Sequence, residues 1–298
     1  MINDIGNNIK ELLGLKDIEC VSRLIKKNIV FKTIIDNRPY AIKLYLNGNN
    51  FERKNKEELL YNYFYNKKII NVPSVYDTID INIGPIMIIE WIDGTSIKNK
   101  LKLNGLDKSI TNINNMLQDM NKIWNVDIND LSTLSIDKLG IDNRLEEDVD
   151  VIKETIRENK NNIDFTELFK CYDILYKNIE PTFDKVINSD ISAHEYIIKN
   201  NVGYWIDFER YCIGDSNNDL ARSFMSLTNG IVNKKDEIYR IYDLFASQGT
   251  FTRDVFAYFL IEKLMCSIFD APLQISEEEI SFYSYFVKEK VLQKKSSF

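Results

Sequence analysis

The segment INSDISAHEYIIKNNVGYWIDFERYCIGDSNNDLA, residues 187–221, carries most of the information about the fold. It contains two short apolar runs, YII and YWI, joined by the polar turn KNNVG. This pattern is typical of a β-hairpin. Such a hairpin brings Asp190, which precedes the first strand, near Asp207, which follows the second. Two carboxylates held close together can share a divalent cation, or one can bind a metal while the other accepts a proton, as a phosphoryl-transfer site requires.

The chain before this segment begins with a pattern of strands interrupted by one helix. Apolar and β-branched residues predict three strands, and leucine and aromatic spacing then predicts a helix. Pro73 and the pair Gly84–Pro85 mark the extended segments that follow. The helix therefore interrupts the sheet between its third and fourth strands. The expected strands cover residues 18–25, 28–35 and 40–46, the helix covers 51–67, and the extended segments cover 71–77 and 84–94.

After Gly94 the periodicity becomes mainly helical. Apolar spacing predicts helices over residues 108–124, 146–160, 165–178, 218–229, 235–247, 253–269 and 276–292. The expected fold class is α+β, with a small β-rich lobe carrying one helix over residues 1–93 and a larger, mainly α-helical lobe over residues 94–298. The charges divide in the same way. Residues 1–93 carry 13 Lys+Arg against 12 Asp+Glu, and the remaining residues carry 25 against 33.

Composition excludes several classes of protein. The 298 residues include 44% apolar residues and 5 prolines, values typical of globular protein rather than of disordered or collagen-like chains. The uncharged apolar runs fall far short of the roughly 18 residues that indicate a membrane span. Residues 1–20 carry charges throughout, so we expect neither a signal peptide nor a transmembrane helix. A net charge of -7 argues against a nucleic-acid partner.

Cysteine and histidine usage narrows the chemistry further. The 4 cysteines are scattered without a CxxC pair, which predicts neither a disulfide framework nor a zinc site and favours a reducing cytoplasm. His194 is the only histidine in the chain, so it is the only one available to a catalytic triad.

The order of these motifs resembles the aminoglycoside phosphotransferase and choline kinase superfamily, small-molecule kinases with a bilobal protein-kinase-like fold. YAIKLY with Lys43 resembles the third-strand lysine motif, and IIEWIDG resembles the hinge between the lobes. INSDISAHEYII resembles the catalytic loop, IDFE the metal-binding segment, and GDSNNDLA the GDPxxDLA motif. The resemblance covers nearly the whole chain. It implies an ATP- or GTP-dependent enzyme that phosphorylates a hydroxyl group of a small molecule.

The resemblance also implies roles for residues of the first lobe. Lys43 is expected to bind the α- and β-phosphates, with a glutamate of the 51–67 helix as its ion-pair partner. Glu57 is the expected partner because it lies one turn before Leu60 on the buried face, and Glu58 is the alternative.

The hinge resemblance implies contacts to the nucleotide base. The carbonyl of Glu90 would accept from the adenine amino group, the amide of Ile92 would donate to the ring, and Ile89 would lie behind the base.

In the second lobe, Asp190 resembles the catalytic base and Asp207 the main Mg²⁺ ligand. Asp219 resembles the aspartate that braces the catalytic loop, and together with Asp215 it is expected to be structural. His194 is expected to make local contacts only.

The chain departs from the family pattern at functionally important positions. The nucleotide loop, expected near residues 24–29, has no glycine, and Lys26 and Lys27 could supply charge in its place. Asn188-Ser189 replaces the His-Gly that precedes the catalytic aspartate. Glu195 replaces an asparagine that can both donate a hydrogen bond and bind a second Mg²⁺, whereas a glutamate carboxylate only accepts. We therefore count Glu195 as a metal ligand, with a disabling substitution as the alternative.

Two other functions stay open. A nucleotide-binding pseudokinase that acts as a regulatory or interaction module fits Glu195 and the glycine-free loop. A protein-directed kinase is less consistent with the sequence, because no APE motif follows IDFE. The acidic second lobe would suit a cationic acceptor such as an aminoglycoside or a choline-like compound, with Glu146, Glu147, Asp148 and Asp150 as its candidate wall. The sequence leaves the acceptor, the choice of ATP or GTP, and the oligomeric state undetermined.

Overall fold

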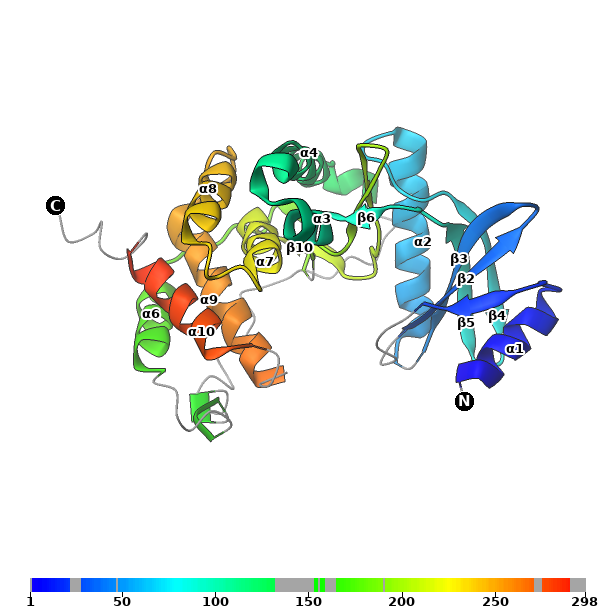
Figure 1. The fold of residues 1–298 in the computed structure, drawn as a ribbon, viewed down its shortest axis with the longest axis horizontal. Coiled ribbons are helices and arrows are strands. Elements are labelled where there is room, and N and C mark those ends of the chain that lie inside the picture. The colour runs from blue at the N-terminus through cyan, green and yellow to red at the C-terminus, as the bar shows by residue number, and fades with distance from the viewer. Residues whose placement is uncertain are drawn as a thin grey trace. The chain divides into compact units, whose positions relative to one another are not determined.

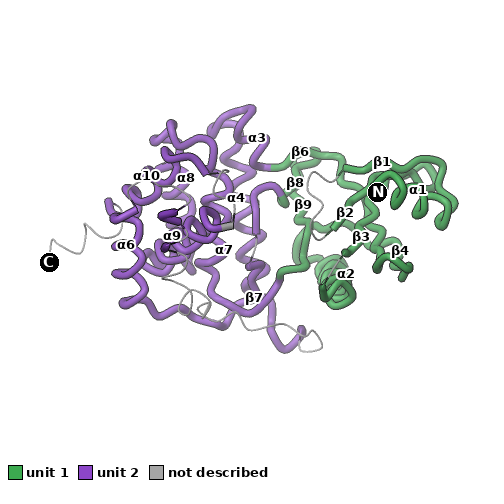
Figure 2. Tube along the Cα trace, turned by 90° about the horizontal axis from the view of Figure 1, so that it is seen from below, with its two compact units in different colours: residues 1–96, 132–135, 195–210 green, residues 97–131, 136–194, 211–298 purple. Residues whose placement is uncertain are grey.

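The computed structural model describes residues 2–21, 28–46, 48–131, 153–154, 156–158, 165–189, 191–270 and 275–289. The chain divides into two compact units, coloured separately in Figure 2. The first unit contains the described residues up to Ser96 together with Glu195–Arg210, and the second contains the other described residues. The first unit thus ends close to the expected boundary after residue 93. It also takes in the 195–210 hairpin, which the sequence assigns to the second lobe.

The first unit is built on a five-stranded antiparallel sheet with the order β1-β2-β3-β5-β4 (Figure 1). Helix α2 (Asn50–Lys67) follows the third strand, so the expected interruption of the sheet is confirmed. Asp36 and Asn37 have φ values of 48° and 62°, the left-handed conformation of a two-residue hairpin turn between β2 and β3. The strands are β1 (Ile18–Cys20), β2 (Asn28–Ile35), β3 (Arg38–Tyr45), β4 (Val75–Ile81) and β5 (Gly84–Glu90).

Alternation along the strands separates the two faces of this sheet. Ile42 and Leu44 of β3 belong to a buried cluster that also contains Ile9 of the N-terminal helix α1 (Ile2–Leu12). Lys43 and Tyr45 therefore lie on the opposite face. Helix α1 is absent from the sequence-based prediction.

A second, three-stranded sheet in the same unit contains the predicted hairpin. It has the order β6-β8-β9, with β6 (Thr95–Ser96), β8 (Tyr196–Lys199) and β9 (Val202–Trp205). Asn200 and Asn201 form the turn with φ values of 51° and 63°. A Cβ atom added at Gly203 would lie 1.9 Å from the Tyr196 hydroxyl oxygen, so this position requires glycine beneath the tyrosine ring.

The second unit is mainly helical, as predicted. A two-stranded antiparallel ladder pairs β7 (Lys185–Asn188) with β10 (Tyr211–Gly214). Its helices are α3 (Ile97–Asn104), α4 (Leu106–Trp124), the 3-10 helix η1 (Ile128–Leu131), α6 (Thr166–Tyr176), α7 (Ser216–Thr228), α8 (Lys235–Ala246), α9 (Arg253–Asp270) and α10 (Glu277–Val287). Most of the helix expected over 146–160, with Glu146, Glu147, Asp148 and Asp150, lies outside the described residues. Within the part that is described, no helix combines the length and apolarity needed to cross a membrane.

Candidate functional site

Lys43 forms the centre of a charged cluster in the first unit. Its ammonium nitrogen lies 2.6 Å from Glu57 Oε2, 2.8 Å from Asp207 Oδ1 and 3.7 Å from Glu209 Oε2. Glu58 is not its partner, because the Glu58 carboxylate pairs with Lys54 at 3.1 Å. The helix glutamate that pairs with Lys43 is therefore Glu57, as the buried-face argument predicts.

Burial and charge act on this ion pair in opposite directions. Burial by itself would lower the pKa of Lys43, but the carboxylates of Asp207, Glu57 and Glu209 outweigh that effect and raise the pKa above its ordinary value. Burial raises the pKa of Glu57, and the Lys43 ammonium offsets only part of this rise. Glu57 also accepts hydrogen bonds from the Tyr45 hydroxyl at 2.6 Å and from the Phe208 amide at 3.3 Å.

One face of helix α2 holds the segment Asp207–Glu209. Arg53, Glu57 and Tyr61 are spaced four residues apart, which places them on one face of the helix. The Arg53 guanidinium donates to Glu209 at 3.3 Å, Glu57 accepts from the Phe208 amide, and the Tyr61 hydroxyl accepts from the Asp207 amide at 3.0 Å. Each of the three consecutive residues is thus bound by a different turn of α2.

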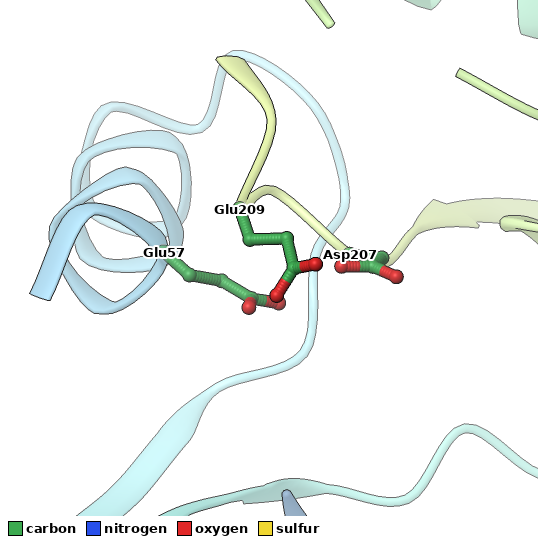
Figure 3. A group of neighbouring side chains, drawn as sticks. All are labelled: Glu57, Asp207 and Glu209. Carbon is green, nitrogen blue, oxygen red and sulfur yellow. The ribbon is translucent and has the colours of Figure 1, made fainter. Parts of the chain in front are cut away.

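The three carboxylates of this cluster offer oxygen atoms to a metal ion. Oxygens of Glu57, Asp207 and Glu209 lie within 4.8 Å of one another (Figure 3). Carboxylate oxygens are the ligands that Mg²⁺ prefers. The Asp207 side chain is 41% exposed, whereas those of Glu57 and Glu209 are 1% and 8% exposed. The donor set fits a divalent cation, and the partly exposed Asp207 is the member whose carboxylate an ion can reach from solvent.

The expected hinge begins in the last residues of strand β5. Ile89 and Ile92 are buried, and Glu90 is the last residue of the strand. The Glu90 amide donates to Ser74 O and the Trp91 amide donates to Pro39 O. The backbone hydrogen bonds of the described residues include none donated by the Ile92 amide.

Some predicted site residues cannot be assigned a geometry. Asp190, Lys26 and Lys27 lie outside the described residues. Glu195 is partly buried, its carbonyl accepts from the Ile206 amide, and its carboxylate is not a member of the group formed by Glu57, Asp207 and Glu209. The metal-binding role of Glu195 stays a prediction.

Comparisons with solved structures agree on one architecture. Spectinomycin phosphotransferase APH(9)-Ia, solved with ADP and spectinomycin, superposes with a TM-score of 0.63 at 15% identity, over 96% of this chain and 94% of that chain. Aminoglycoside phosphotransferase APH(4)-Ia gives 0.63 at 12% identity, over 98% and 100%. The GDP complex of aminoglycoside 2'-phosphotransferase-IIIa gives 0.64 at 10% identity, over 99% of each chain.

The chain has the kinase-like fold of the aminoglycoside phosphotransferases. The resemblance inferred from the sequence motifs is confirmed at the level of the fold. No protein-family model and no curated protein sequence matches the chain.

Within the second unit, Asp219 braces strand β7, which precedes the expected catalytic loop in the sequence. Asp219 is buried, and its Oδ2 accepts from Trp124 Nε1 at 3.0 Å and from the Asn188 amide at 3.1 Å. Burial raises the pKa of Asp219 to about 7. Asp215 caps helix α7 through the Asn217 amide. Both aspartates have the structural contacts that the sequence predicts, while His194 is exposed and its amide donates to Ser192 Oγ.

Several residues of the cluster around Lys43 were not predicted from the sequence. Tyr45, Arg53 and Tyr61 were not assigned to the site, and neither was Asn28, which donates to Glu209 Oε2 at 2.8 Å, while Glu209 was included only as the last residue of IDFE. Two patterns could have indicated them. Arg53 and Tyr61 are one turn before and one turn after Glu57 on α2. Tyr45 follows Lys43 by two residues, which places it on the same face of β3.

Proposed function

We propose that this protein is an ATP- or GTP-dependent phosphotransferase that phosphorylates a hydroxyl group of a small molecule. The observation that carries the proposal is the contact of Lys43 with both Glu57 and Asp207. A strand lysine paired with a helix glutamate is the arrangement that binds nucleotide phosphates in kinases. Neighbours in structure include an enzyme solved with ADP and spectinomycin and another solved with GDP and kanamycin, which supports a small-molecule acceptor.

The proposed roles follow from chemistry and position. Lys43 binds the α- and β-phosphates, and Glu57 orients it. Asp190 accepts the proton of the attacking hydroxyl group, and Glu195 supplies a carboxylate to the metal. Positioning and charge neutralisation provide most of the rate in such a transfer.

The base of the nucleotide is proposed to bind at the hinge. The Ile92 amide donates to the ring, and the Glu90 carbonyl accepts from the exocyclic amino group. Ile89 forms the apolar surface behind the base.

Asp207 would hold Mg²⁺, and the ion would neutralise charge that develops on the transferred phosphoryl group. Lys43 shares Asp207 Oδ1, so the lysine and an ion bound there would compensate the same carboxylate. The proposed compartment is the cytoplasm, in which the 4 free cysteines stay reduced.

A coupled ADP-release assay tests the activity directly. Purified protein is incubated with Mg-ATP or Mg-GTP and a panel of cationic and neutral hydroxyl compounds, with protein substrates as a separate arm. We expect release of nucleoside diphosphate with small hydroxyl compounds only. Stabilisation by Mg-nucleotide without turnover on any acceptor would indicate the pseudokinase instead, and turnover with proteins alone would indicate a protein kinase.

Nucleotide binding is tested by thermal unfolding. Mg-nucleotide at 100 times its Kd stabilises the folded state by about 2.7 kcal/mol and raises the melting temperature. Lys43→Ala and Asp207→Ala should each shrink the shift measured against their own ligand-free melting temperature. Lys54→Met is the matched control, because it removes an α2 ion pair with Glu58 outside the cluster. No shift of the folded wild-type protein at millimolar Mg-ATP or Mg-GTP would count against the site.

A further inference from the structure

Glu209 completes a closed triangle of polar side chains beside Lys43. Asn28 Nδ2 donates to Glu209 Oε2 at 2.8 Å. One guanidinium nitrogen of Arg53 donates to the same Glu209 oxygen at 3.3 Å and to Asn28 Oδ1 at 3.2 Å. The three residues come from the start of β2, the first turns of α2 and the segment after β9. They tie together parts of the chain that are far apart in sequence.

The contacts of this triangle require the particular donor and acceptor groups of its three residues. The amide of Asn28 uses its oxygen as an acceptor and its nitrogen as a donor at once, which an aspartate at the same position cannot do. Arg53 uses its second terminal nitrogen to hold the Leu46 carbonyl at 2.7 Å. Glu209 is largely buried and also lies 3.7 Å from the Lys43 ammonium. The triangle is therefore a specific arrangement and not a loose surface ion pair.

The same triangle controls the charge around Lys43. The Lys43 ammonium lies 5.1 Å from the centre of the Tyr45 ring, and the Arg53 guanidinium carbon lies 6.0 Å from it. Both cations thus lie near the Tyr45 ring, and the Glu209 carboxylate lies within 4 Å of a nitrogen atom of each. With a neutral residue at this position, Arg53 would lose the countercharge that Glu209 supplies at 3.3 Å. The carboxylates of Glu57 and Asp207 also lie nearby, and both hold Lys43.

We propose that Glu209, acting through Arg53 and Asn28, is a positioning residue for nucleotide binding. It keeps Arg53 away from the partners of Lys43 and fixes the first residue of β2. This inference rests on the proposed function, because Lys43 is the group that it positions for the phosphates. Glu209 itself touches neither the nucleotide nor the acceptor in this account.

The test compares Glu209→Gln, Asn28→Asp and the double variant Arg53→Met/Glu209→Gln with the wild-type protein and the Lys54→Met control. The Kd for Mg-ATP or Mg-GTP is measured by calorimetry below the melting temperature of every variant, and KM and kcat are measured with the best acceptor. We expect Glu209→Gln and Asn28→Asp to raise the nucleotide Kd and KM roughly tenfold. The KM for the acceptor should stay unchanged. The double variant should recover part of the lost affinity, since it removes the guanidinium together with the carboxylate that binds it.

A purely structural role for the triangle would give a different result. The melting temperature would fall while the nucleotide Kd stayed within about twofold of wild type, and that outcome would overturn the proposal. If Glu209→Gln fails to fold, the nucleotide Kd of Asn28→Asp provides the test, because this variant retains Glu209, Arg53 and Lys43. Absence of Mg-nucleotide binding in the wild-type protein would remove the proposed function and this inference together. Binding that depends on Lys43 but not on Glu209 would remove the inference alone.

Discussion

The three carboxylates around Lys43 differ in their exposure and in the number of hydrogen bonds that hold them. Asp207 is the most exposed of the three, and its φ of 67° places it in the left-handed region. An L-residue other than glycine seldom adopts this conformation without support, and here the Tyr61 hydroxyl holds the Asp207 amide. The backbone is therefore fixed while the side chain remains accessible. Glu57 is buried and accepts from donors of three residues, so it serves as a permanent anchor for Lys43.

Glu195 provides the sharpest test at the level of one residue. If its carboxylate binds Mg²⁺ in place of the usual asparagine, Glu195→Ala should raise the Mg²⁺ concentration needed for half-maximal activity and lower kcat by roughly tenfold or more. Asp190→Asn should nearly abolish turnover while nucleotide affinity is kept, because only the proton acceptor is lost. Steady-state kinetics at varied Mg²⁺ concentration measure both effects.

Two outcomes would contradict this account. A rise in turnover in Glu195→Asn would identify Glu195 as a disabling substitution. Near-full activity in Asp190→Asn would exclude Asp190 as the catalytic base.

Asp219 predicts a pH dependence of stability. Its pKa is raised from the ordinary 3.8 to about 7 by burial. The folded state therefore holds the proton more tightly than the unfolded state, so the stabilisation from this group is complete below about pH 4 and is lost as the pH rises through 7. Between pH 5 and 8, the free energy of unfolding should fall by about 2.5 kcal/mol more in the wild-type protein than in Asp219→Asn. Urea unfolding across this range measures the difference, and parallel pH profiles would show that Asp219 does not titrate there.

At the level of elements, helix α2 shows which part of the site the sequence could predict. The spacing of Glu57 to Leu60 and Phe64 was enough to identify the ion-pair partner of Lys43, because helical periodicity is a local property. The contacts of Arg53 and Tyr61 join α2 to residues 207–209, and no local pattern connects segments so distant in sequence. Helix α1 was also missed, although Ile2, Ile5 and Ile9 follow helical spacing. Its burial comes from packing Ile9 against the sheet.

The β8–β9 hairpin makes a prediction about its turn. Asn201 has a φ of 63°, a conformation that asparagine and glycine tolerate and β-branched residues do not. Asn201→Val should destabilise the protein by about 1–2 kcal/mol, whereas Asn201→Gly should be close to neutral. Denaturant midpoints of the two variants against wild type provide the measurement. Equal midpoints for the valine and glycine variants would mean that the turn can change its conformation without cost.

At the scale of the whole molecule, the excess of acidic residues beyond residue 93 predicts the kind of acceptor. An acceptor cation attracted by this charge should show a KM that rises with salt between about 0.05 and 0.5 M. The KM for Mg-nucleotide, measured in parallel, separates this effect from a general response to ionic strength. A neutral best acceptor, or an acceptor KM that ignores salt, would identify the acidity as ordinary surface charge. The candidate wall at 146–150 lies outside the described residues, so the charge balance alone supports this prediction.

The 164-residue separation between Lys43 and Asp207 also affects how the protein is made. Translation starts at the N-terminus, so strands β1–β5 and helix α2 leave the ribosome before the 195–210 segment has been synthesised. Lys43 then has Glu57 as a partner but not Asp207 or Glu209. The first unit is thus completed late in synthesis, because a nascent chain that ends before Asp207 lacks two of the three carboxylates that surround Lys43 in the folded unit. A pulse of protease applied to stalled chains of increasing length should therefore find this unit protected only after Glu209 has left the exit tunnel.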